Sequence, residues 1–78
     1  MYYDVTSVKP MEGYHLDLSF EDGKRGTFDM SKYLSLPAFK PLRAKALFSR
    51  AFVDEGTVAW PGDIDIAPEH LWSKCVVK

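Results

Sequence analysis

The sequence predicts a single small α+β domain, in which a mainly antiparallel sheet of about five strands carries its helices on one face. Apolar and polar residues alternate strictly from Tyr14 to Phe20, as in a strand with one buried face. Two Gly-containing turns, at residues 21–23 and 54–56, are typical of hairpins, and a stretch with helical apolar spacing lies between them. These features give the predicted order β-β-β-α-β-β-α.

Length and composition favour one folded domain over residues 1–78. Of the 78 residues, 46% are hydrophobic and 27% are charged, a balance that argues against disorder and low-complexity repeats. No apolar run approaches the roughly 18–20 residues that span a membrane, and the first residues lack the pattern of a signal peptide. We therefore expect a cytoplasmic protein without a membrane partner. The single cysteine, Cys75, cannot form an internal disulfide, so the core or an oligomer must supply the stability.

Composition and alternation predict the first two strands. Tyr3 to Val8 is rich in β-branched and aromatic residues, and Pro10 and Gly13 are expected to end this strand. In the second strand, the positions predicted to face the core are Tyr14, Leu16, Leu18 and Phe20. The positions predicted to face outward are His15, Asp17 and Ser19.

Burial selects the register of the turn at residues 21–23. A three-residue loop places Leu18 opposite Gly26 and Leu16 opposite Phe28, which keeps one face of the hairpin apolar. A two-residue loop mixes the two faces. The matching turn is type I, with its glycine left-handed in a G1 bulge.

The same type of turn is expected at residues 54–56, Asp-Glu-Gly. A three-residue loop there places Phe52 opposite Val58, and Val58 shares a face with Trp60.

The chain between the hairpins is expected to be helical. Asp29 or Ser31 can cap a short turn over residues 31–34, and Pro41 suits the first turn of a helix. The apolar residues from Leu42 to Ala51 follow i, i+3, i+4, i+7 spacing, which predicts a helix over this range. Its apolar stripe consists of Ala44, Leu47, Phe48 and Ala51.

The closing stretch from Trp60 to Trp72 is expected to be structural first. Trp60 ends a strand on the core side, and Pro68 and Glu69 suit the first turn of a helix in which Leu71 packs back on the sheet. The alternation here places Ile64 and Ile66 inward and Asp63 and Asp65 outward. Because Ala67 is a poor N-cap, a carboxylate of either aspartate is expected to supply the cap bond.

Charge is distributed unevenly. Ten basic and eleven acidic residues give a net charge of −1 and a pI near 6.0, which provides no general attraction to nucleic acid or anionic lipid. Residues 40–50 carry four basic residues and no acidic one, namely Lys40, Arg43, Lys45 and Arg50. These cations can meet phosphates, with Phe39 or Tyr33 as a stacking surface, or an acidic protein partner. Such a charge run is more often a solvated helix face.

No motif indicates an enzyme. The chain lacks a nucleophile elbow, a P-loop and a dinucleotide-binding glycine motif, and Cys75 has no CxxC partner. The group of Asp63, Asp65, Glu69 and His70 matches no metal-binding spacing, so we expect a solvated acidic turn, with no metal and no cofactor. His15 is expected to be an ordinary surface residue. A cleft near Trp60, with Asp63 and Asp65 as acid–base groups, is the enzymatic alternative.

Three stretches of the sequence match a known pattern. The first runs from Tyr14 to Gly23 and continues over residues 26–29, and the second is Phe39-x-Pro41-Leu42 with Leu47-Phe48. The third and most specific runs from Val58 to Trp72 and includes Trp60-Pro61-Gly62-Asp63-Ile64-Asp65-Ile66-Ala67-Pro68-Glu69. On these residues the chain resembles the small bacterial family catalogued as domain of unknown function 2442.

The resemblance implies an α+β domain from the bacterial cytoplasm and implies no reaction, since the family has no established activity or catalytic residues. Some relatives join this domain to a DNA-binding helix-turn-helix, which suggests transcription regulation, and others are suspected members of toxin–antitoxin-like pairs. The sequence ends at Lys78 without a helix-turn-helix, so we expect no direct sequence-specific DNA binding.

We therefore expect a non-enzymatic protein-interaction module, for example the antitoxin-like half of a pair, that binds another protein or forms a homo-oligomer. Eleven Phe, Tyr and Trp residues exceed what a core of this size easily hides, and exposed aromatics often mark interfaces. The alternative is a nucleic-acid-binding accessory or regulatory domain that uses residues 40–50. The candidate binding residues are Lys40, Arg43, Lys45, Arg50, Trp60, Asp63 and Asp65.

Overall fold

The structure, a computed structural model, describes residues 3–77 and contains two antiparallel sheets. The first sheet has the order β1-β2-β3-β7 and consists of β1 (Val5–Met11), β2 (His15–Phe20), β3 (Arg25–Asp29) and β7 (Val76–Val77). The second has the order β4-β5-β6 and consists of β4 (Phe52–Asp54), β5 (Thr57–Trp60) and β6 (Ile64–Ile66). The helical segments are the 3-10 helices η1 (Ser31–Tyr33) and η2 (Pro37–Arg43) and the α-helices α1 (Lys45–Phe48) and α2 (Pro68–Lys74). The α+β class is confirmed, whereas the single sheet of about five strands is wrong.

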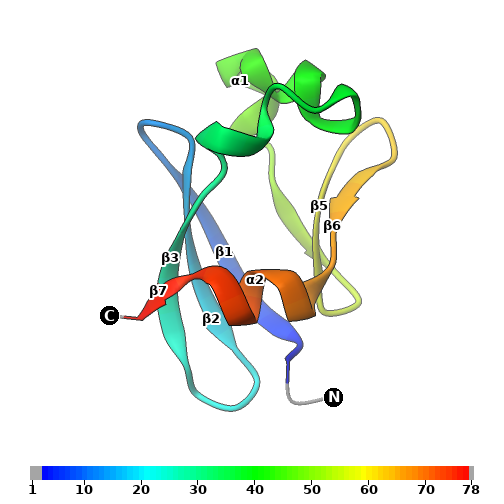
Figure 1. Ribbon diagram of the computed structural model, residues 1–78. Helices are drawn as coiled ribbons and strands as arrows, with labels where there is room; N and C mark the ends of the chain where they lie inside the picture. The colour runs from blue at the N-terminus through cyan, green and yellow to red at the C-terminus, as the bar shows by residue number, and fades with distance from the viewer. Residues whose placement is uncertain (1–2, 78) are drawn as a thin grey trace.

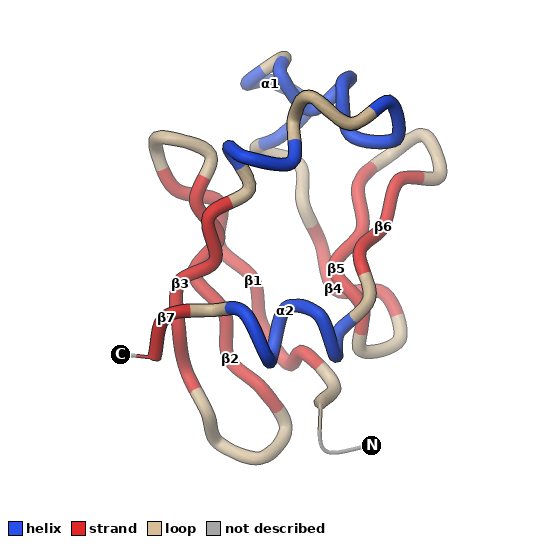
Figure 2. Tube along the Cα trace, viewed as in Figure 1, coloured by secondary structure: helices blue, strands red, loops and turns tan. Residues whose placement is uncertain are grey.

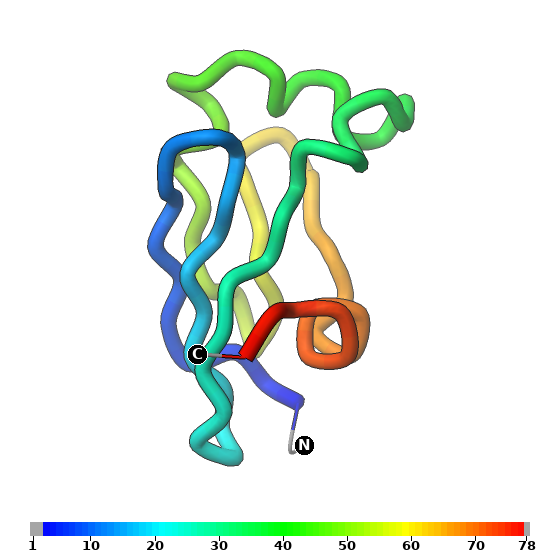
Figure 3. Tube along the Cα trace, turned by 60° about the vertical axis from the view of Figure 1, so that its left-hand side comes forward, coloured from blue at the N-terminus to red at the C-terminus, as the bar shows by residue number. Residues whose placement is uncertain are grey.

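The helices lie in two places and not on one face of a sheet. The segments η1, η2 and α1 gather at one end of the molecule, across the ends of both sheets (Figures 1 and 2), and we call residues 31–50 the helical cap. Helix α2 instead spans the side between β7 and β6, and the turned view shows the same two placements (Figure 3). On the opposite side β1 lies beside β4, and the Val5 amide donates to the Gly56 carbonyl at 2.8 Å.

The predicted register of the hairpin formed by β2 and β3 is confirmed. Leu16 lies opposite Phe28 and Leu18 lies opposite Gly26, so the buried side chains share one face. The turn glycine, Gly23, has a φ of +92° and donates its amide to the Phe20 carbonyl at 3.0 Å. The turn residues alone allow a loop of two or three residues, and the alternation of apolar residues in the strands correctly predicted the three-residue loop.

The first strand is longer than expected. It begins at Val5 and continues through Pro10 to Met11, where Tyr3 to Val8 was predicted. Pro10 fits because β1 is an outer strand of its sheet, and a proline without an N–H is tolerated there.

The turn at residues 54–56 differs from the prediction. Phe52 pairs with Ala59 and Val53 with Val58, so the loop holds only two residues. Those two residues, Glu55 and Gly56, have φ values of +50° and +82°. Two consecutive left-handed residues form the tight hairpin turn whose twist matches that of the flanking strands.

The helix predicted over residues 42–51 is broken at Ala44, whose ψ of 112° is extended. In an unbroken helix the Arg43 carbonyl would accept from Leu47, but it accepts from the Tyr14 hydroxyl, and Leu47 donates to Ala44. The result is the 3-10 helix η2 followed by the four-residue helix α1. Phe48 of the predicted stripe is buried, whereas Ala44 is exposed.

One hydrophobic core joins both sheets, the cap and α2. Trp60 is 1% exposed and Leu71 is fully buried, as expected for the closing stretch, and Asp63 and Asp65 are exposed. The fully or nearly fully buried residues of the core include Leu16, Leu18, Phe28, Met30, Leu42, Val58, Trp60 and Leu71.

Candidate functional site

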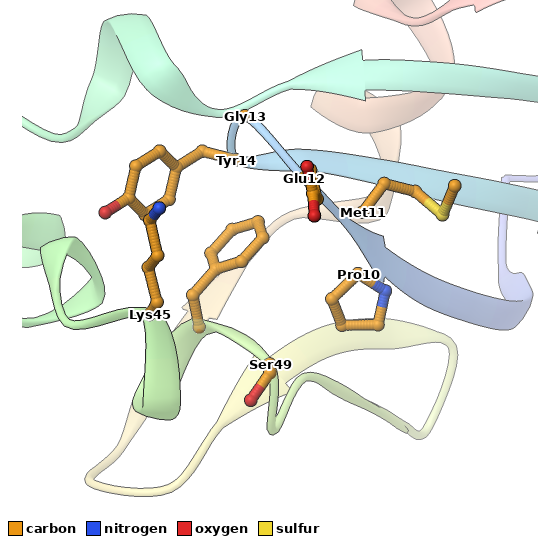
Figure 4. Close-up of a pocket in the computed structure, with 8 residues that line it drawn as sticks. Pro10, Met11, Glu12, Gly13, Tyr14, Lys45 and Ser49 are labelled. Atoms are coloured by element: carbon orange, nitrogen blue, oxygen red, sulfur yellow. The ribbon is translucent and has the colours of Figure 1, made fainter.

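An open pocket of about 340 Å³ lies where the β1–β2 turn meets the helical cap, and we call it the cap pocket (Figure 4). Figure 4 shows Tyr14 and Lys45 on one side of the pocket and Pro10 and Met11 on the other. Its lining residues are Pro10, Met11, Glu12, Gly13, Tyr14, Lys45, Phe48 and Ser49. The end of β1 and the β1–β2 turn supply residues 10–14 of this lining, and α1 with the residue after it supplies Lys45, Phe48 and Ser49.

Tyr14 connects the β1–β2 turn to the helical cap. Its φ of +62° is unusual for an aromatic residue, because the left-handed region crowds the side chain against the backbone. Two contacts retain this conformation. The Tyr14 hydroxyl donates to the Arg43 carbonyl, and its ring meets Phe48 edge-on at a centroid distance of 5.2 Å. Tyr14 therefore lines the pocket and also bonds the last residue of η2.

The rim of the cap pocket is mixed in character. Lys45 and Glu12 are both exposed, so one cation and one carboxylate stand at the opening. Met11 is 45% exposed, and its unbranched thioether adapts to irregular apolar surfaces. Tyr14 and Phe48 provide apolar area inside the pocket. Such a site can hold an apolar side chain and contact charged groups beside it.

The structure places the four predicted basic residues on the exposed surface of the helical cap. Lys40 and Arg43 lie in η2, Lys45 begins α1, and Arg50 follows α1. Only Lys45 lines the cap pocket. Arg43 is partly committed to the fold, because its Nε donates to the Leu34 carbonyl at 3.1 Å.

The predicted residues of the closing stretch separate into core and surface. Trp60 is buried, and its indole nitrogen is bonded to the Phe48 carbonyl. Asp63 and Asp65 are exposed and line a shallow pocket of about 270 Å³ beside Phe52. Within residues 3–77, no group of three His, Cys, Asp or Glu residues is arranged to hold a metal ion.

The predicted carboxylate cap on α2 is not formed. Helix α2 begins after Ala67, and within residues 3–77 no side-chain cap bond is formed at its start. The reason is that Asp65 lies in β6 and projects from the sheet away from Ile66. Pro68 at the first helical position also removes one amide that a cap would satisfy.

A second pocket, of about 410 Å³, was missed by the sequence analysis, and we call it the edge pocket. Its lining residues are His15, Thr27, Phe28, Asp29, Lys32, Tyr33, Lys74 and Val76. The Tyr33 ring stacks on Phe28 at 5.5 Å, and the Tyr33 hydroxyl lies 3.0 Å from His70 Nε2. The available signal was the hairpin register, which places His15 opposite Asp29.

Asp29 is the carboxylate that lines the edge pocket, and it forms hydrogen bonds with the first residue of the helical cap. Its Oδ1 accepts from the Ser31 hydroxyl at 2.6 Å and from the Ser31 amide at 2.8 Å. These two bonds, first the hydroxyl and then the amide, lower the pKa of Asp29 below its usual value. Asp29 or Ser31 was predicted to cap this turn, but the N-cap is Met30, which makes no side-chain cap bond, and Asp29 instead accepts from Ser31 one residue further along. His15 Nε2 lies 3.9 Å from Asp29 Oδ2.

Comparisons with known proteins identify a family but no relative of known function. None of the helices in the described chain is long and apolar enough to cross a membrane. No curated protein and no solved structure matches the chain. The family model described as "Protein of unknown function (DUF2442)" matches residues 5–76, which include every strand and helix except the last residue of β7. The chain therefore belongs to the DUF2442 family.

Proposed function

We propose that this chain is a non-enzymatic protein-interaction module, which docks an apolar side chain of an acidic protein partner in the cap pocket. The observation that carries the proposal is the position of the pocket. Its apolar walls, Tyr14 and Phe48, open beside Lys45 on a surface segment that has no acidic residue. An antitoxin-like role is a special case of this function, in which the bound partner is a toxin.

The pocket supplies an apolar anchor point. Interfaces draw most of their affinity from a few side chains buried in well-packed pockets, while the surrounding contacts exclude water. The exposed Met11 and the half-buried Tyr14 offer apolar surface that a partner can cover. Methionine at such a surface adapts to partners of different shape.

The charge of the helical cap specifies the partner's chemistry. Residues 31–50 carry five cations and no carboxylate, although the whole chain has a net charge of −1. An acidic partner surface is complementary to this segment, which raises the association rate and orients the docking. The cations of the segment are Lys32, Lys40, Arg43, Lys45 and Arg50.

A nucleic acid is a weaker candidate for the same surface. Binding of single strands relies on aromatic rings that stand free to stack with bases. The two rings considered for this purpose, Tyr33 and Phe39, both pack against the core. Arg43, one of the four cations of residues 40–50, is also bonded to the chain itself through Leu34. These contacts favour a protein partner.

The proposal is tested by site-specific photo-crosslinking in extracts of the source cells. A photoreactive phenylalanine replaces Ser49 at the pocket rim, and a matched probe replaces Glu55 at the far turn. We expect one protein to crosslink from position 49 and not from position 55. Lys45→Glu is expected to reduce this crosslinking about tenfold, because it turns an attraction into a repulsion. Arg25→Glu, an exposed position that lines neither pocket, serves as the control and is expected to leave it unchanged.

Several outcomes contradict the proposal. One is crosslinking from position 49 that Lys45→Glu leaves unchanged. Another is a crosslinked product that is nucleic acid, or a second copy of this chain. The identified partner must also lose binding when its own acidic residues at the contact are replaced by amides.

A further inference from the structure

We propose that β7 and the edge pocket form a second docking surface, which takes an extended, acidic segment of a partner protein as an added strand. This surface is separate from the cap pocket, because the two share no lining residue. The proposal therefore stands whether or not the cap pocket binds a partner.

Strand β7 is an open edge of the first sheet. It pairs with β3 on one side and has no strand on the other side within residues 3–77 (Figure 1). Val76 and Val77 are 73% and 61% exposed, the highest values among the exposed large hydrophobic residues of the described chain. An edge that presents unpaired backbone groups and β-branched side chains is a template for another strand.

The position of β7 depends on a close approach to β3. A Cβ atom on Gly26 would lie 2.7 Å from the Val76 carbonyl oxygen and 2.8 Å from Cys75 Sγ. The strand therefore reaches this position because Gly26 has no side chain. The pairing begins at Thr27 opposite Val76 and continues to Gly26 opposite Val77.

The edge pocket lies on the same face as Val76. Paired residues of an antiparallel sheet share a face, so Val76 shares its face with Thr27, and both line the pocket. Side chains of a strand alternate between faces, so every second side chain of an added strand would lie on the pocket's face. Main-chain bonds to β7 would supply affinity, and the pocket would select the side chain.

The charges of the pocket favour a carboxylate. Lys32 and Lys74 are both exposed and line the pocket; the pKa of Asp29 is lowered mainly by its bonds from Ser31 and to a smaller extent by the charge of Lys32. The pocket's own carboxylate, Asp29, already accepts two bonds from Ser31 and faces His15. A charge-assisted bond from an ammonium to an incoming carboxylate is therefore available at two positions.

A second copy of this chain fits the surface less well. Two copies that paired through β7 would bring Val76 and Val77 together and would place near one another two pockets that each carry Lys32 and Lys74. The matching occupant is an extended segment of another protein in which apolar and acidic residues alternate. Strand addition of this kind uses the backbone of the occupant, so it tolerates variation in the apolar positions.

The test uses a fluorescent peptide of alternating valine and glutamate as the probe, with three matched comparisons. The first is a peptide of alternating valine and lysine, and the second is the acidic peptide with N-methylated backbone amides. The third is the protein variant Lys32→Gln/Lys74→Gln beside the control Lys9→Gln, an exposed cation that lines neither pocket. Anisotropy measures the affinity, and amide chemical shifts locate the binding.

We expect saturable binding of the acidic peptide, with shifts in β3 and β7. Lys32→Gln/Lys74→Gln is expected to weaken binding about tenfold or more, because two charge-assisted contacts are lost, and Lys9→Gln is expected to leave it unchanged. The N-methylated peptide and the lysine peptide are expected not to bind. Equal binding of the lysine peptide, binding of the N-methylated peptide, shifts confined to the helical cap, or no saturable binding would each overturn the proposal. A dimer of this chain that depends on Val76 would also overturn it.

Discussion

The indole nitrogen of Trp60 donates a buried hydrogen bond of 2.9 Å to the main-chain carbonyl of Phe48. The two rings also stack at a centroid distance of 6.1 Å. This pair connects the last residue of β5 to the last residue of α1, and so fastens the second sheet to the helical cap. Because Phe48 also lines the cap pocket, the packing of Trp60 supports the wall of that pocket from inside.

Trp60→Ala is expected to cost about 3–5 kcal/mol in the free energy of unfolding, because it leaves a cavity in the core. Asp65→Ala is expected to change it by less than about 0.5 kcal/mol, since the exposed carboxylate has no cap bond to lose. Urea unfolding of the two variants gives the comparison. A larger loss for Asp65→Ala would show that this carboxylate has a ligand-bound role.

Tyr14→Phe is expected to cost about 0.5–1.5 kcal/mol, because it removes the hydroxyl that bonds the Arg43 carbonyl. The ring that meets Phe48 stays in place, so the crosslink from position 49 is expected to persist. Hydrogen exchange of the cap amides measures the local effect. If Tyr14→Phe changed global stability but not exchange in the cap, the bond would not hold the cap to the β1–β2 turn.

Gly26→Ala is expected to displace β7, because the added Cβ meets the main-chain oxygen of Val76 at 2.7 Å. The cross-strand proton contact between Thr27 and Val76 is expected to weaken or disappear in NMR spectra. Gly23→Ala is the control. Its Cβ meets nothing within 4 Å, so it is expected to cost about 1–2 kcal/mol through its positive φ and to leave β7 in place. Equal displacement in both variants would contradict the close-approach argument.

Asp29 is expected to contribute stability that depends on pH. Because its folded-state pKa is lowered, this stability is fully present above the unfolded-state value of about 3.8. It is lost as the pH falls through the lower folded-state value. The difference in unfolding free energy between the wild type and Asp29→Asn is therefore expected to narrow below about pH 3.8. A difference that widens on acidification would contradict this sign.

The pKa of Asp22 is expected to respond to Trp72. Hydrogen bonds from the Lys24 amide, the larger cause, and from the Trp72 indole lower it below 3.8. Trp72→Phe removes only the second bond, so the pKa is expected to rise and still remain below 3.8. NMR titration of the Asp22 carboxyl measures this shift. No change would show that the indole bond between α2 and the β2–β3 turn does not persist in solution.

The sequence by itself determined those features that depend on which face a residue occupies. The period-two pattern of residues 14–20 determined the buried positions of β2 and the three-residue turn after it, because a slip of one residue would expose the core face. Alternation over residues 63–66 also placed Ile66 inside, the predicted closing helix placed Leu71 against the sheet, and the charge run of residues 40–50 was expected to be a solvated face. The family resemblance was confirmed over residues 5–76.

The tertiary structure decided the features that depend on contacts between distant segments. The helix over residues 42–51 is broken at Ala44, and the Arg43 carbonyl beside the break accepts from the distant Tyr14 hydroxyl. The strand β7 and the edge pocket exist because Gly26 lets the end of the chain approach β3, which no local pattern around Val76 records. The spacing of apolar residues within a segment predicts which face of that segment is buried. It does not predict which distant segment packs against that face, because the contacting residues lie elsewhere in the chain.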